Sequence, residues 1–187
     1  MANVFDVAAY ILKKCGPMSA MKLQKLCYYS QAWSLVWDDD TLFNENIEAW
    51  INGPVVPALY SKHKGFFKIF PEIIGGNPEN LSLSQKETID AVCDTYFKFN
   101  AQQLSDLTHS ETPYINARKG LNPFQRGHKI ITLEDMSEYN DIIKRKYLPK
   151  IKGWRDKLAI ARTQCLNKDI SEKQYGLYVP VPKGYEG

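Results

Sequence analysis

One segment leaves little choice about the architecture of this chain. From Ser19 to Trp37 the sequence is typical of a helix, and Ser19 itself is a favoured N-cap residue. The large apolar side chains of the segment are spread around most of the helix circumference: Leu23, Leu26, Tyr29, Trp33, Val36 and Trp37. A helix that is apolar on nearly every side must be surrounded by other elements. We therefore expect a central, buried helix with a domain assembled around it.

Amphipathic segments supply the surrounding elements. Between Val4 and Cys15 apolar residues recur with helical spacing, and Gly16-Pro17 provides a stop. A second such stripe runs from Ile89 to Phe97, after a capping-box pattern at Ser84 and Glu87, and should pack on the central helix. Further helices are expected in four places: Pro57 to Gly65, Asn100 to Ser110, Thr112 to Gly120, and Thr132 to the residue before Pro149.

Short extended runs interrupt the helices. Thr41 to Phe43 and Ile47 to Ile51 flank an Asn-rich turn and predict a small hairpin, while His128 to Thr132 predicts a brief strand. Residues 71–82, with two prolines and two glycines, predict a loop. The fold class expected is mainly α: a compact helical domain with a small β-hairpin, over residues 1–148.

Residues 149–187 differ in kind and are expected to form a basic C-terminal arm. Residues 141–187 hold 11 Lys and Arg against 5 Asp and Glu, a net charge of +6, which leaves 13 against 16, or −3, for residues 1–140. A narrow apolar stripe at Ile151, Trp154, Leu158, Ala161 and Cys165 predicts an amphipathic helix suited to docking. The Pro-containing stretch from Tyr178 to Tyr185 predicts an extended tail.

Cysteine usage and hydropathy point to the cytoplasm. The four cysteines are far apart with no C-x-x-C pair, so neither a zinc ribbon nor a redox motif is present, and buried reduced thiols are expected. The first apolar run lies between Asp6 and Lys13-Lys14, which inverts the charge order of a secretory signal. No run approaches the ~18 apolar residues of a membrane span, so no membrane association is expected.

One cluster has the residue types of a catalytic site. Asp106 and His109 stand at i and i+3 of an expected helix, with Glu111 close behind, and a phosphodiesterase could use such a pair. With three histidines in the whole chain and no H-E-x-x-H pattern, a metal site lacks ligands. A hydrogen-bond network at the helix end is the simpler interpretation, so we expect no enzyme activity, cofactor or metal.

The stretch from Ile47 to Gly65 is rigid and apolar. Pro54 and Pro57 each fix a φ angle, so the turn loses little entropy when a partner contacts it. The apolar area comes from Trp50, Val55, Val56 and Tyr60. Such a turn either closes the core or presents a preorganised protein-binding surface, and spacing alone leaves both open.

The segment from Lys144 to Lys157 mixes cations with two aromatic residues. It is compatible with nucleic-acid binding, with an arm that grips an acidic protein, or with a solvated basic face whose aromatics point inward. The solvated face is favoured over a DNA footprint, because no helix-turn-helix or other DNA-reading motif accompanies the charge. Nucleic acid stays open as an alternative partner.

Three segments together resemble a known family. MSAMKLQKLCYYSQAW (Met18 to Trp33), IEAWINGPVVPALY (Ile47 to Tyr60) and LSDLTHSETPYINAR (Leu104 to Arg118) are similar in order and spacing to the Panacea domain, the SocA-like or GepA-like family. Members of this prokaryotic, phage-associated family are antitoxins that neutralise unrelated toxins by direct binding, and the SocA member is also a proteolytic adaptor.

The resemblance implies a partner and a mode of action. The partner is a cognate toxin encoded next to this gene, in a type II toxin–antitoxin system, with a protease or chaperone as a possible third component. The partner-binding residues we predict are Trp50, Val55, Val56, Tyr60, Lys144, Arg145, Trp154, Arg155 and Leu158. The resemblance also suggests that the proline turn is largely a fold-defining element that supports a binding face.

Overall fold

The computed structural model describes residues 2–147, with side chains described up to residue 142. Its helices are α1 (Val4–Cys15), α2 (Ala20–Trp37), α3 (Pro57–His63), α4 (Pro71–Ile74), α5 (Leu83–Tyr96), α6 (Ala101–His109), α7 (Thr112–Ala117) and α8 (Leu133–Tyr147), with a 3-10 turn, η1 (Pro78–Asn80). Its strands are β1 (Met18–Ser19), β2 (Glu48–Trp50), β3 (Gly53–Val55) and β4 (Lys68–Ile69). The mainly helical fold is confirmed. The expected arm, residues 149–187, lies outside the described residues.

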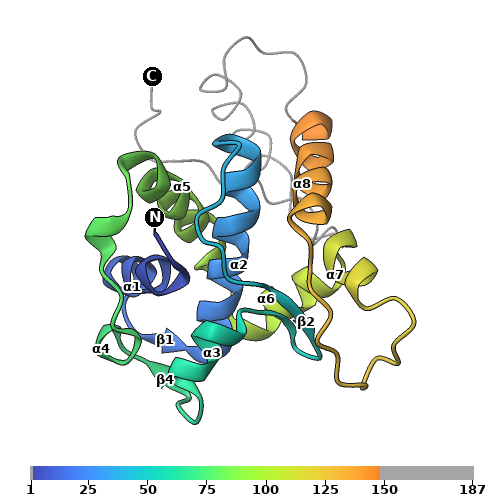
Figure 1. Cartoon of the computed structure of the whole chain (residues 1–187), viewed down its shortest axis with the longest axis horizontal. Coiled ribbons are helices and arrows are strands. Elements are labelled where there is room, and N and C mark those ends of the chain that lie inside the picture. Colours follow the sequence, from blue (N-terminus) through green and yellow to red (C-terminus); the bar gives the residue numbers. More distant parts are fainter. Residues whose placement is uncertain (1, 148–187) are drawn as a thin grey trace.

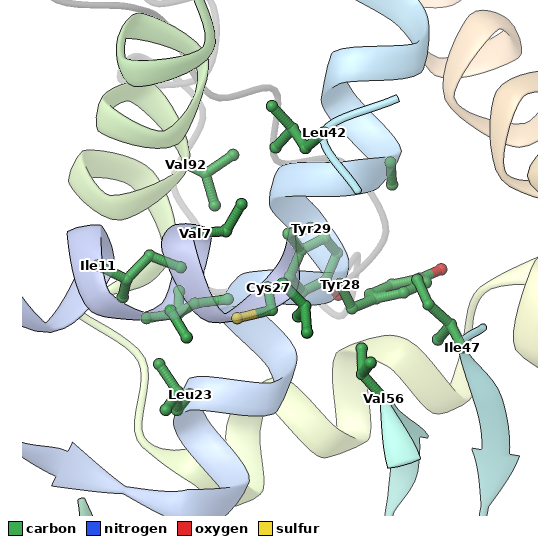
Figure 2. Packing of buried hydrophobic residues seen from close by; sticks show 14 of the residues in the cluster. Val7, Ile11, Leu23, Cys27, Tyr28, Tyr29, Leu42, Ile47, Val56 and Val92 are labelled. Carbon is green, nitrogen blue, oxygen red and sulfur yellow. The ribbon is translucent and has the colours of Figure 1, made fainter. Parts of the chain in front are cut away.

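The central helix is also confirmed. α2 runs through the middle of the domain and packs against α1, α5, α6 and α8 (Figure 1). Its side chains are buried almost all round, and Trp33 Nε1 donates to the hydroxyl of Tyr96 on α5 at 3.1 Å. Figure 2 shows Leu23, Cys27, Tyr28 and Tyr29 of α2 between side chains of the neighbouring elements. In the described part of the chain, no helix is both long and apolar enough to cross a bilayer.

The hairpin exists, but the predicted pair of strands was wrong. β2 pairs with β3 in antiparallel register, Glu48 with Val55 and Trp50 with Gly53. Residues 41–43 form no strand. The Gln31 side chain takes the place of a neighbouring strand there, because its Oε1 accepts from the amides of Leu42 and Phe43 and its Nε2 donates to the Phe43 carbonyl.

The register explains how a proline fits inside β3. Ala49 lies opposite Pro54, and the Ala49 amide donates to the Lys129 carbonyl on the other side of β2, at 2.9 Å. In an antiparallel pair, opposite residues whose polar groups point outward exchange no hydrogen bond. The missing amide hydrogen of Pro54 therefore removes no hydrogen bond between the two strands. The brief strand predicted near residue 130 is present as a bridge between Ile130 and Glu48.

Two further expectations are corrected. Residues 71–82 are not a loop, because Pro71 and Pro78 each occupy the first turn of a short helix and the segment binds α1 through the Asp6 carboxylate, which accepts from the Asn77 amide at 2.8 Å. The helix expected from Ser84 begins at Leu83. Its capping box is formed by Ser82 and Gln85, while the Ser84 hydroxyl donates to Asp38.

Candidate partner-binding site

The hairpin is anchored to α2 by a glutamine. Gln24 Oε1 accepts from the Val56 amide at 2.8 Å, and its Nε2 reaches the Val56 carbonyl and His63 Nε2 at 3.4 and 2.9 Å. Because the amide nitrogen can only donate, His63 Nε2 accepts and the ring is neutral. Burial lowers the pKa of His63, which favours this neutral form.

A lysine on the next position of α2 also binds the hairpin. Lys25 is buried, and its Nζ donates to the Pro54 carbonyl at 3.0 Å. Burial lowers the pKa of Lys25 to about 7. A Cβ at Gly53 would lie 2.7 Å from Lys25 Cε and 2.7 Å from Thr108 Oγ1, and the Gly53 φ is +98°. The turn therefore needs glycine both for its backbone conformation and for the space that the lysine occupies.

A buried carboxyl completes this layer. Glu111 accepts from the hydroxyls of Tyr29 and Tyr28 at 2.9 and 3.3 Å, and Tyr29 stacks on Tyr96 with ring centroids 4.1 Å apart. Burial raises the pKa of Glu111 to about 8, although the two donated hydrogen bonds act in the opposite direction. Gln24, Lys25, Tyr28, Tyr29 and Glu111 therefore serve the interior, which accounts for the density of polar residues in the first and third motifs.

The solvent side of the hairpin carries an aromatic cluster. The rings of Trp50 and Tyr60 meet edge to face, with centroids 4.9 Å apart, and the His128 ring lies 5.6 Å from Trp50. Glu48 Oε2 joins them, because it accepts from Trp50 Nε1 at 2.7 Å and lies 3.0 Å from His128 Nδ1. Trp50 and Tyr60 are half-buried, so part of each ring is accessible.

The predicted site residues fall into three groups. The structure brings Trp50 and Tyr60 together at the surface, whereas Val55 and Val56 are buried and belong to the support beneath them. The backbone of α8 includes positions 144 and 145, but the side chains of Lys144 and Arg145 are not described. Trp154, Arg155 and Leu158 lie outside the described residues. Their joint participation in one surface stays a prediction.

The catalytic-looking pair is held apart by other partners. The exposed Asp106 carboxylate accepts from Gln102 Nε2 at 2.8 Å. The His109 ring stacks on Tyr114 with centroids 4.5 Å apart, and its buried Nε2 has no hydrogen-bond partner. Burial and the nearby Lys25 lower the pKa of His109. Among residues with described side chains, no three metal-ligating groups converge.

Two strongly exposed phenylalanines are not among the residues predicted from the sequence. Phe67 and Phe124 are 87% and 90% exposed, respectively. Both lie in short segments without helical or alternating periodicity, the pattern on which residue-by-residue interpretation depends. Gly120 and Gly127, on either side of Phe124, are a turn signal that no prediction above used, and nothing in the local sequence indicates which side chain such a turn presents.

The comparisons agree with the motif-based resemblance. Residues 23–114, about half of the chain, match the family model described as antitoxin SocA-like, Panacea domain. No curated protein and no solved structure matches the chain. The matched segment runs from α2, through the hairpin and α5, to Tyr114 on α7, and so contains the whole buried polar layer. Residues 23–114 of this chain are an antitoxin SocA-like Panacea domain.

Proposed function

We propose that this protein is the antitoxin of a type II toxin–antitoxin system and neutralises a cognate toxin by direct protein–protein binding in the cytoplasm. The observation that carries the proposal is the Panacea-domain match over residues 23–114, which contains both the hairpin and its polar support. The antitoxin acts stoichiometrically and catalyses no reaction. In keeping with this, Lys25 and Glu111 are engaged in the interior. Asp106 accepts from Gln102, and the His109 ring stacks on Tyr114, so these two residues are not bonded to each other.

The proposed contact surface has two parts. The exposed portions of Trp50 and Tyr60 form a rigid aromatic patch, since the hairpin and α3 are both held to α2 through Gln24 and Lys25. The second part is the basic arm, with Trp154, Arg155 and Leu158, together with the nearby cations Lys144 and Arg145. Aromatic and arginine anchors contribute most of the binding free energy in typical interfaces.

Co-expression tests the proposal. The product of the adjacent gene, expressed alone, should arrest growth, and co-expression of this protein should restore growth, with the two proteins co-purifying. If the adjacent gene product is harmless, or if rescue occurs without a complex, direct neutralisation is excluded.

The arm can be tested in the same cells. Trp154→Ala should weaken toxin binding by about 30-fold, the effect of losing an anchor worth about 2 kcal/mol, while Trp154→Phe retains most of the affinity. Circular dichroism checks that the domain is folded. Rescue by Trp154→Ala at wild-type level, even at low expression, removes this residue from the interface.

Two alternatives have distinct signatures. A nucleic-acid-binding regulator that uses residues 144–157 is favoured by the +6 charge of residues 141–187, and it would bind random duplex DNA with an affinity that falls steeply with salt. A proteolytic adaptor would shorten the half-life of the toxin in cells, and deletion of the protease would abolish rescue. Direct neutralisation predicts rescue without the protease.

A further inference from the structure

A surface loop between α7 and α8 is organised by one buried arginine. The Arg118 Nη2 donates to the carbonyls of Asn122, Pro123 and Gln125, at 3.1, 3.3 and 2.8 Å. Its Nη1 donates to the Ala49 carbonyl on β2 at 3.1 Å. Four main-chain oxygens thus converge on one guanidinium, whose planar set of donors suits such an arrangement. Residues 121–127, here called the Phe124 loop, are thereby attached to the hairpin.

Additional contacts fix the shape of the Phe124 loop. The Gln125 amide donates to the Asn122 carbonyl at 3.0 Å, and Gln125 Oε1 accepts from the Asn122 amide at 3.3 Å. A Cβ at Gly127 would lie 3.0 Å from Arg118 Nη1 and 3.2 Å from the Ala49 carbonyl oxygen, so the loop leaves no room for a side chain there. In Figure 1 the chain between α7 and α8 extends away from the helical body.

The side chain that this loop presents is apolar. Phe124 stands between Pro123 and Gln125, whose carbonyls Arg118 binds, and it is the most exposed large hydrophobic residue of the described chain. Exposure of a whole phenyl ring to water is unfavourable by roughly 2 kcal/mol relative to burial. Because the backbone of this loop is already ordered, binding through Phe124 would lose little further conformational entropy.

The charges around the loop define what would cover Phe124. Between Thr112 and Leu133 there is no Asp or Glu, whereas Lys119, Arg126 and Lys129 are exposed. A second copy of the chain would present the same positive charges, and residues 149–187, with 8 Lys and Arg against 4 Asp and Glu, carry the same sign. Like charges oppose both of these occupants, and an acidic surface is the complementary one.

A protein fits this site better than a nucleic acid does. The loop offers a single aromatic ring, whereas a strand-binding surface stacks several bases on several rings. Lys129 Nζ is also engaged by the Lys119 carbonyl at 3.0 Å. We infer that Phe124 is an aromatic anchor that enters an apolar pocket rimmed by acidic residues on the toxin. This inference rests on the proposed function, and it adds a surface outside the three motifs.

The test compares two equally exposed phenylalanines. The probe is the adjacent gene product, made by cell-free synthesis and immobilised, and the full-length chain is the analyte. Phe124→Ala should raise the Kd at least about 30-fold. Phe67→Ala, a change of the same size and exposure next to β4, should alter the Kd by less than threefold. β4 and the Phe124 loop lie well apart in Figure 1.

A second variant tests the role of the loop support. Arg118→Lys keeps the positive charge but cannot bind four carbonyls at once. We expect hydrogen exchange at the Gln125 amide to accelerate, and the Kd to rise about three- to tenfold with Phe124 unchanged. Arg126→Glu should slow association, because the charge that faces an acidic rim is reversed.

The outcomes separate this inference from the proposed function. If the wild-type chain does not bind the probe, both are rejected. If it binds and Phe124→Ala, folded by circular dichroism, shifts the Kd by less than threefold, or if Phe67→Ala has the same effect as Phe124→Ala, only the anchor is rejected. Loss of binding to a single-stranded oligonucleotide in Phe124→Ala, with toxin binding intact, would assign the loop to nucleic acid and overturn the anchor.

Discussion

Two buried cations hold the hairpin, and they do so in different ways. Lys25 and Arg118 are 1% and 9% exposed, and they bind the carbonyls of Pro54 and Ala49, which lie opposite each other in the two strands. Lys25 has one main-chain acceptor, and burial lowers its pKa to about 7. Arg118 has four acceptors, and a guanidinium stays charged at every ordinary pH.

The two sites differ because lysine can lose its proton when it is buried, whereas arginine cannot. A lysine with a single acceptor can release its proton and remain as a neutral amine, so its position tolerates a dry environment at the centre of the fold. An arginine cannot release its proton, so it needs several oxygens, and collecting them orders a loop. Lys25, the interior site, therefore stabilises the domain, whereas Arg118, the peripheral site, determines the conformation of a surface loop.

The largest loss of stability is expected at Gly53, where Lys25 leaves no space for a side chain. Gly53→Ala should lower the free energy of unfolding by about 3 to 4 kcal/mol, because a positive φ and a contact with the buried Lys25 and Thr108 are both unfavourable. Gly65→Ala has a similar φ, +90°, with nothing within 4 Å of the added Cβ, and should lose only about 1 kcal/mol. Urea denaturation measures both. Equal losses would show that Lys25 does not restrict the turn.

The next effect compares the two cations directly. Arg118→Met should lower the free energy of unfolding by about 3 kcal/mol, since four carbonyls lose a charged donor. Lys25→Met should lower it by about 1 kcal/mol, because the lost bond to Pro54 is partly offset by removing a buried amine. Chemical denaturation of the two variants gives the ranking, and the reverse order would contradict the proposed division of roles.

The third prediction is a pH dependence that arises from Glu111 and Lys25 in the interior of the domain. The pKa of Glu111 is raised to about 8, so its contribution to stability declines as the pH rises from about 4.5 to 8. The pKa of Lys25 is lowered to about 7, so its contribution is regained between about 7 and 10.5. Together they predict a stability minimum near pH 7 to 8, with slopes of at most about 1.4 kcal/mol per pH unit.

Substitutions can assign the falling, acidic limb and the rising, alkaline limb of the stability–pH curve to individual residues. Glu111→Gln should flatten the acidic limb and leave the alkaline limb, and Lys25→Met should do the reverse. Arg118→Met should change neither slope, because its charge is constant over this range. Thermal unfolding followed from pH 5 to 10 provides the measurement, and a curve for Glu111→Gln that runs parallel to wild type would show that this carboxyl is ionised in the folded protein.

The sequence predicted the elements that repeat a periodic pattern. The stripe of α1, the all-round apolar surface of α2 and the helical stretch after Ser82 each carry their own signal, and α2 lies at the centre as expected. Of the two predicted hairpin strands, the run from Ile47 to Ile51 contains β2, whereas residues 41–43 were assigned wrongly because a side chain can satisfy an extended backbone. Gln31 binds residues 42 and 43 as a strand would, and only the folded chain brings it there.

The site was predicted only in part, for a related reason. Trp50 and Tyr60 were candidates as members of the rigid apolar turn, whose spacing left core and surface both open. The structure places their half-buried rings in contact, and their role in binding stays a prediction. The Phe124 loop depends on Arg118 reaching a carbonyl 69 positions away in the chain, at Ala49, and nothing local marks an arginine as the centre of such a network. The burial of Val55 and Val56 likewise depends on β3 lying against α2 and α6.

The continuity from Arg118 through Ala49 and Pro54 to Lys25 has a mechanical consequence. A force applied at the tip of the loop passes through the Arg118 side chain to β2, across the paired strands to β3, and through the Lys25 side chain to the central helix. Residues 121–127 and the hairpin should therefore move with the helical body as one stiff unit. A toxin that docks on this side meets a surface whose form exists before the encounter.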